Sequence, residues 1–122
     1  MRFISTKIHA VLDFLIGIAL IVFPWILGFA GEGPAQTVLV SVGIVIAGMS
    51  LLTNHEFGIY KIVPMEIHLL VDAFMGLFLM MSPWLIGFAH VEIGPHILIG
   101  MLVIVVAVFS KVKPAGYSPA KI

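Results

Sequence analysis

The chain has 122 residues, of which 61% are hydrophobic and 10% are charged, and its formal net charge at pH 7 is zero. Soluble globular domains are about 45–50% apolar and about 25% charged, so this composition indicates a membrane protein. The neutral charge and the lack of a basic run argue against a nucleic-acid partner. The sequence contains no cysteine, which excludes disulfides, iron–sulfur clusters and thiol chemistry.

Four apolar stretches cover residues 8–30, 35–52, 67–89 and 94–112. A helix needs about 20 apolar residues to cross a bilayer, so the first and third stretches are long enough and the second is adequate. The fourth reaches sufficient length only if Lys111 extends its amine to the lipid headgroups. None of the stretches alternates with a period of two, which favours helices over a β-barrel.

Residues 7–30 and 66–89 share the pattern I-H-x3-D-x3-G-x6-P-W-x2-G-F-A. The two copies are offset by 59 positions, so that His9 corresponds to His68. Self-similarity at a fixed period indicates a tandem duplication. We predict one membrane domain over 1–122, with repeat 1 at 7–53 and repeat 2 at 66–110. Arg2 and Lys7 before the first stretch also resemble a signal peptide, but its closing Gly-Phe-Ala recurs at 87–89, inside the chain.

All six Lys and Arg residues fall on one side of a four-span arrangement. They are Arg2, Lys7, Lys61, Lys111, Lys113 and Lys121. Positively charged loops stay in the cytoplasm, so both termini are expected there. Each repeat crosses twice, and the repeats are therefore parallel and related by a pseudo-two-fold axis along the membrane normal. The predicted fold class is an all-α polytopic membrane protein with four transmembrane helices in two tandem helical hairpins.

The segments FPWILGFA and SPWLIGFA each end the first helix of a repeat. They resemble the SPW repeat family of small bacterial and archaeal membrane proteins, over residues 7–110. Ser82 completes the motif in the second copy, whereas Phe23 replaces the serine in the first. The resemblance implies a two-helix repeat unit in a membrane and implies no activity, cofactor or catalytic residue.

The Pro-Trp pairs lie about 24 Å along the helix from the repeated histidines, near the opposite membrane face. Tryptophan favours that interface and proline ends or kinks a helix, so we predict helix breaks with interfacial anchors. An aromatic ligand pocket is the alternative. The predicted structural motif comprises Pro24, Trp25, Gly28, Ser82, Pro83, Trp84 and Gly87.

His9 and Asp13, like their copies His68 and Asp72, are four residues apart and share one helical face. Ionisable groups inside a span are costly and mark functional candidates. Gly17 and Gly76 continue the same face, which should therefore contact a partner helix, as should Gly43 with Ala47 in the second stretch.

Three hypotheses account for the two pairs. In the first, His9 meets Asp72 and His68 meets Asp13, forming a polar clasp between the first and third helices. In the second, His9 and His68 hold a metal or haem, with the carboxylates as ligands or orienting groups. In the third, Asp13 and Asp72 carry protons or ions, although no polar residue continues that route outward.

The remaining histidines give weaker signals. His90, Glu92 and His96 crowd one predicted outer loop and could bind a divalent metal, although they are unrepeated and expected to be solvated. His55 and Glu56 are expected to form a polar turn.

We expect no enzyme activity, because the sequence offers no nucleophile with a base and no phosphate-binding loop. The favoured function is structural or accessory, in the cell membrane of a prokaryote, as a homo-oligomer or a subunit of a larger membrane complex. No cofactor is predicted, and an electron-transfer carrier of haem or metal at His9 and His68 is the main alternative.

The orientation predicts that, after Ile122, a reporter that works only in the cytoplasm is active and one that works only in the periplasm is inactive. A label at position 31 should be accessible only from outside the cell. The positive residues on one side are the physical reason. Fusions with paired cytoplasmic and periplasmic reporters provide the measurement, and a periplasmic C-terminus would contradict the prediction.

Overall fold

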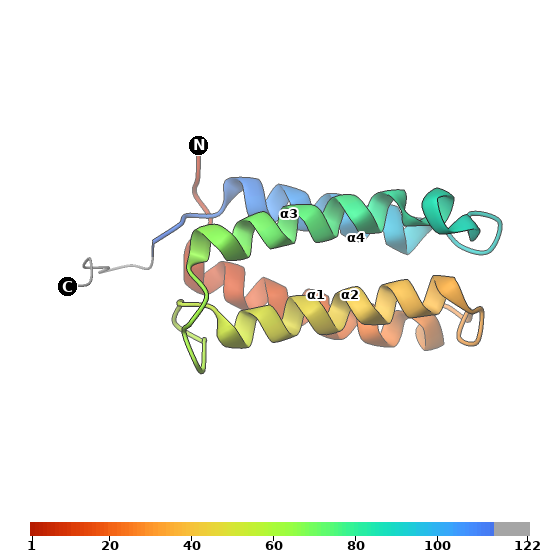
Figure 1. The fold of residues 1–122 in the computed structure, drawn as a ribbon, viewed down its shortest axis with the longest axis horizontal. Helices are drawn as coiled ribbons and strands as arrows, with labels where there is room; N and C mark the ends of the chain where they lie inside the picture. The colour runs from red at the N-terminus through yellow and green to blue at the C-terminus, as the bar shows by residue number, and fades with distance from the viewer. Residues whose placement is uncertain (114–122) are drawn as a thin grey trace.

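A computed structural model describes residues 1–113 and is helical apart from two isolated bridges within that range (Figure 1). The helices are α1 (Thr6–Ile26), α2 (Pro34–Leu52), α3 (Met65–Ser82) and α4 (Gly94–Phe109), with a π-helical turn, η1 (Pro83–Gly87), continuing α3. The all-α prediction with four helices is confirmed.

Three helical segments are long and apolar enough to cross a membrane: Thr6–Ile26, Pro34–Leu52 and Met65–Gly87. The fourth, α4, has 16 residues and is therefore about 24 Å long, shorter than a hydrocarbon core of about 30 Å. The predicted extension to residue 112 is wrong. Ser110 has an extended backbone, and the N–H of Lys111 donates to the carbonyl of Ile4, so the chain leaves the helix to pair with the N-terminal segment.

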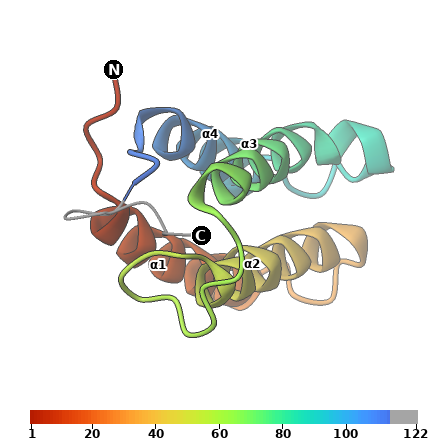
Figure 2. The same cartoon turned by 60° about the vertical axis from the view of Figure 1, so that its left-hand side comes forward.

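The helices form two hairpins stacked on one another, α1 with α2 and α3 with α4 (Figure 2). Glycines set the close approach within each hairpin. A Cβ on Gly43 would lie 2.8 Å from the carbonyl oxygen of Gly17, and a Cβ on Gly76 would lie 2.7 Å from that of Gly100. The Gly17 and Gly76 faces therefore contact a helix as predicted, but the partner is the hairpin mate.

The described Lys and Arg residues of the loops and termini gather at one end of the bundle. Figure 1 shows the N-terminal segment, loop 53–64 and the end of α4 at one end, and the loops 27–33 and 88–93 at the other. The described Lys and Arg residues of the loops and termini belong to the first end, whereas Glu32 and Glu92 belong to the second. Lys121 lies outside the described residues.

Two parallel bridges tie the hairpins together at the end that carries the N-terminus. Ile4, just before α1, pairs with Ser110 after α4, and Val63, just before α3, pairs with Thr53 after α2. Each pairing joins the entrance of one long helix to the exit of a second helix. Ile4 and Val63 are 59 positions apart, so the bridges follow the sequence repeat.

A continuous apolar core fills the bundle between its two ends. Leu20, Leu39, Ile46 and Leu79 are its largest fully buried aliphatic side chains, one or two from each of three helices. Because these side chains interdigitate without polar groups, the polar residues buried in the bundle are confined to its ends.

Candidate functional site

Four ionisable side chains meet in the first two turns of α1 and α3. His9 and His68 are 0% exposed, Asp13 is 3% exposed and Asp72 is 1% exposed. The helices α1 and α3 lie diagonally in the bundle, and each packs mainly on its hairpin mate. The side chains therefore reach across the centre of the bundle to form one cluster, here called the His–Asp cluster.

The cross-repeat pairs predicted from the sequence are present. The Nε2 atom of His68 lies 2.6 Å from Oδ2 of Asp13, and Nε2 of His9 lies 3.0 Å from Oδ2 of Asp72. Each Nε2 is also 3.1 Å from the carboxylate of its own helix, and the two Nε2 atoms are 3.2 Å apart. All four ligand atoms lie within 4.8 Å of one another, the single such group of three or more His, Cys, Asp or Glu found in residues 1–113.

The Nδ1 atoms of both histidines bond to hydroxyls at the helix exits. Nδ1 of His9 lies 2.7 Å from Oγ of Ser110, and Nδ1 of His68 lies 2.6 Å from Oγ1 of Thr53. Each hydroxyl donates its only hydrogen to a carbonyl four residues earlier, Ser110 to Val106 and Thr53 to Met49. The imidazoles must then donate through Nδ1–H, which leaves both Nε2 atoms directed at the carboxylates.

This tautomer determines the charge that the cluster needs. With neutral imidazoles, the two Nε2 lone pairs and the two carboxylates would all be acceptors around one centre, and four acceptors at about 3 Å repel one another. Two positive charges at this centre restore neutrality and give each of the four atoms that face it, two Nε2 and two Oδ2, a partner. Either two protons or one divalent cation supplies them.

The cluster is less symmetric around the carboxylates than around the imidazoles. Ser50 donates a hydrogen bond of 3.0 Å to Oδ2 of Asp13. Thr53 and Ser110 are 57 positions apart and occupy equivalent places in the two repeats. The same offset places Ala107 at the equivalent of Ser50, and Ala107 has no hydroxyl to donate. Within residues 1–113, Oδ1 of Asp72 is buried and has no hydrogen-bond partner.

Loop 53–64 closes the cluster from the end of the bundle. The predicted turn is present, since the N–H of Gly58 donates to the carbonyl of His55, but His55 itself is 1% exposed, with its ring centroid 6.0 Å from that of His68. Burial lowers the pKa of His55 below its ordinary value, which favours the neutral ring. Its neighbour Glu56 accepts a hydrogen bond of 2.6 Å from Thr6, which ties the loop to the start of α1. Gly58 lets the loop fold tightly, because a Cβ there would overlap the carbonyl oxygen of Thr53.

The N-terminal segment closes the other side. Arg2 donates to the carbonyls of Ala107 and Ser110 at 3.1 and 2.7 Å, where the last carbonyls of α4 lack helical partners. Together with the bridge at Ile4, this contact holds the Ser110 hydroxyl beneath His9.

The second group of histidines does not form a site. His96 lies inside α4, fully buried against Phe88, and its Nε2 bonds to the carbonyl of Ala35 at 3.0 Å. Glu92 instead accepts from the backbone N–H groups of Ile93 and Gly94 at the start of α4. The prediction of a solvated group is therefore wrong for His96, which joins the hairpins at the opposite end, whereas His90 is exposed.

The serine of the second Pro-Trp motif compensates for the proline that follows it. Pro83 has no N–H to donate to the carbonyl of Leu79, its partner four residues earlier. The buried hydroxyl of Ser82 donates to that carbonyl instead, at 2.8 Å. Phe23 holds the equivalent place before Pro24 and cannot do this. The second copy continues into η1, whereas α1 runs through Pro24 to Ile26.

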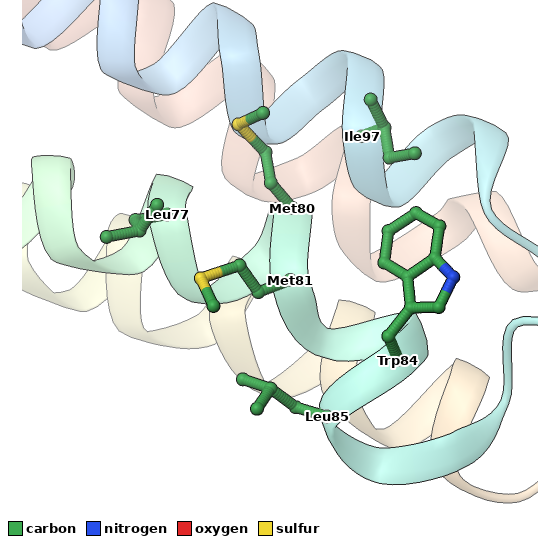
Figure 3. A pocket seen from close by; sticks show the side chains of 6 residues that line it. All are labelled: Leu77, Met80, Met81, Trp84, Leu85 and Ile97. Atoms are coloured by element: carbon green, nitrogen blue, oxygen red, sulfur yellow. The ribbon is translucent and has the colours of Figure 1, made fainter.

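The tryptophans lie on the outside of the bundle and each is 60% exposed. Trp84 lines an apolar hollow of about 550 Å³ with Leu77, Met80, Met81, Leu85 and Ile97 (Figure 3). Gly28 and Gly87 end the two helices with φ of 81° and 93°, and nothing lies within 4 Å of a Cβ there. These glycines are required by the left-handed turn and not by packing.

Sequence reasoning missed the hydroxyls of Ser50, Thr53 and Ser110. An offset of 59 aligns the first helices of the repeats, but Thr53 and Ser110 are 57 positions apart, as are Gly43 and Gly100. A separate alignment of the second helices provides the signal that identifies Thr53 and Ser110, but not Ser50, which aligns with Ala107.

The sequence signature of the SPW repeat domain matches residues 7–110, so the chain belongs to the SPW repeat family. No curated protein and no solved structure matches it.

Replacing Ser82 by Ala should lower the free energy of unfolding by about 1–3 kcal/mol, because the buried carbonyl of Leu79 loses its donor. Unfolding in mixed detergent micelles, followed by circular dichroism, provides the measurement. Ser41→Ala on the exposed face of α2 is the matched control and should change stability by less than about 0.5 kcal/mol. Equal effects of the two changes would contradict the role assigned to Ser82.

Proposed function

We propose that this member of the SPW repeat family is a non-enzymatic membrane protein in which the His–Asp cluster holds two hairpins in register. It serves as a structural or accessory component of a prokaryotic cell membrane, with both termini in the cytoplasm. Its partners are the lipid bilayer and either further copies of itself or the subunits of a larger membrane complex, and no nucleic acid is involved.

The observation that carries this proposal is the pairing of four buried ionisable side chains across the two hairpins, His9 with Asp72 and His68 with Asp13. Breaking a buried charge pair by removing one partner typically costs about 3–5 kcal/mol, whereas replacing the whole pair by apolar groups is often neutral. A hydrogen bond between membrane helices contributes about 0.6 kcal/mol on average. The cluster therefore specifies one register of the hairpins more than it adds to their total stability.

The enclosure of the cluster supports a role without catalysis. All four residues are at most 3% exposed, and loop 53–64 and the N-terminal segment cover the nearest end of the bundle. An organic substrate would have to displace these segments to reach any of the four groups.

The outer surface supports contact with lipid or another subunit. Large apolar side chains are exposed along the helices, among them Leu15 on α1, Phe74 on α3, and Leu98 and Val108 on α4. An apolar surface in a hydrocarbon layer needs no further cover, and the same surface can pack against another apolar helix.

Two of the alternatives find less support in the geometry. The Nε2 atoms of His9 and His68 are 3.2 Å apart with both carboxylates against them, which leaves no space for a porphyrin between the rings. A proton path from Asp13 or Asp72 toward the Trp end would have to cross the apolar core around Leu20 and Leu79.

The clasp predicts that His68→Ala lowers the free energy of unfolding by about 3–5 kcal/mol in metal-free protein, because two carboxylates then share one imidazole. Replacing His9, Asp13, His68 and Asp72 together by apolar residues should cost less than His68→Ala alone. Unfolding in mixed micelles with a chelator present provides the measurement.

The exposed His90 offers the matched control for this series, and His90→Ala should leave stability within about 0.5 kcal/mol of the parent. The clasp is excluded if His68→Ala changes the free energy of unfolding no more than this control does. It is also excluded if the fourfold replacement lowers that free energy by as much as the four single changes added together.

The accessory role predicts an assembly larger than one 13.2 kDa chain in native membranes. Native mass spectrometry of tagged protein released directly from membranes into nanodiscs measures this mass. A homo-oligomer gives whole multiples of the chain mass, a complex gives additional defined subunits, and a single chain throughout would contradict the role.

A further inference from the structure

We propose that the His–Asp cluster is a tetrahedral binding site for one divalent transition metal, with Zn²⁺ as the best-fitting ion. The ligands are Nε2 of His9 and His68 and Oδ2 of Asp13 and Asp72. The inference rests on the proposed clasp and deepens it, because the ion replaces two protons at the same centre.

The ligand geometry supports four-coordination. Among the four atoms, five of the six distances lie between 2.6 and 3.2 Å. A tetrahedral zinc ion bound at about 2.0 Å places neighbouring ligand atoms about 3.3 Å apart. A slight outward movement of the four groups therefore creates the site, without a change of rotamer or of helix position.

The charge at the centre supports a divalent ion. Two carboxylates carry two negative charges, and an imidazole that bears a hydrogen on Nδ1 and none on Nε2 is neutral. One divalent cation makes the buried cluster neutral, and both Nε2 lone pairs can coordinate it. This removes the unfavourable arrangement of four hydrogen-bond acceptors that face one another at a buried centre.

The surrounding groups match those that orient metal ligands. A ligating histidine usually donates its other N–H to an oxygen, and here Thr53 and Ser110 accept from His68 and His9. Independently, Asp72 is 1% exposed and its Oδ1 has no hydrogen-bond partner in the described chain, as expected for a carboxylate whose main partner is an ion.

The donor set selects the class of metal. Calcium and magnesium take six or more oxygen ligands, and imidazole nitrogen is a poor ligand for both. Two imidazoles with two carboxylates in a tetrahedral arrangement suit zinc, and a site closed by four protein ligands is typical of a structural ion. His55 is not a fifth ligand, because its Nδ1 accepts from the N–H of Phe57 at 3.3 Å and its Nε2 then carries the hydrogen.

The test uses the full chain purified in detergent after growth with added Zn²⁺. Elemental analysis should find one zinc per chain, and chelation should lower the thermal midpoint, which Zn²⁺ but not Mg²⁺ restores. X-ray absorption at the zinc edge should show four nitrogen and oxygen neighbours at about 2.0 Å. These measurements on the unsubstituted protein test the metal site even if a variant fails to fold.

Substitutions separate the ligands from the groups that orient them. Asp72→Asn retains the shape of the side chain but loses its charge, and should weaken zinc binding at least 100-fold in chelator competition. Thr53→Val and Ser110→Ala should each weaken it by about 10- to 100-fold. His90→Ala and His96→Gln, which change histidines outside the cluster, should retain one zinc per chain with unchanged affinity.

The outcomes distinguish the metal site from the clasp. A parent protein that binds no zinc, or zinc binding that survives Asp72→Asn and disappears in His90→Ala, overturns the metal site. The clasp still stands in that case if His68→Ala is destabilising in the chelator. Conversely, stoichiometric zinc in a protein whose metal-free form tolerates His68→Ala supports the site and excludes the proton-bridged clasp.

Discussion

Charge neutrality inside an apolar layer is the constraint on which the rest of this structure depends. Two carboxylates and two imidazoles are buried in a bundle whose core is mostly apolar, and each needs partners that water cannot supply. The carboxylates of one hairpin satisfy the imidazoles of the other. The hairpins therefore meet in one relative position, and a shift of either by a turn would leave charges unpaired.

The internal repeat meets this constraint economically, because one set of contacts is used twice. Each histidine donates to a hydroxyl at the exit of the other repeat's second helix, and each bridge pairs that exit with the entrance of a long helix. The copies then differ at two hydroxyl positions. Ser50 has no counterpart at Ala107, and Ser82 provides the donor that Phe23 cannot, beside an otherwise identical Pro-Trp pair.

Much of the site could be predicted because it depends on local geometry. Spacing of four residues places His9 with Asp13 on one face, and the repeat with its parallel orientation brings His68 and Asp72 to the same depth. The failures have a common physical cause. The end of α4, the burial of His55 and the position of His96 each depend on a distant segment, namely Ile4, His68 and Ala35. Apolar patterning does not reveal such partners.

The sequence by itself determined that this is a duplicated, helical membrane protein with a His–Asp face in each copy, since composition, period and helical spacing are properties of the chain alone. The tertiary structure alone decided that the two faces form a single closed cluster. Only the packed bundle brings the hydroxyls of Thr53 and Ser110 beneath the imidazoles and thereby directs both Nε2 atoms at one centre. A hydrogen bond needs atoms within about 3 Å, and no spacing along the chain specifies that distance between separate helices.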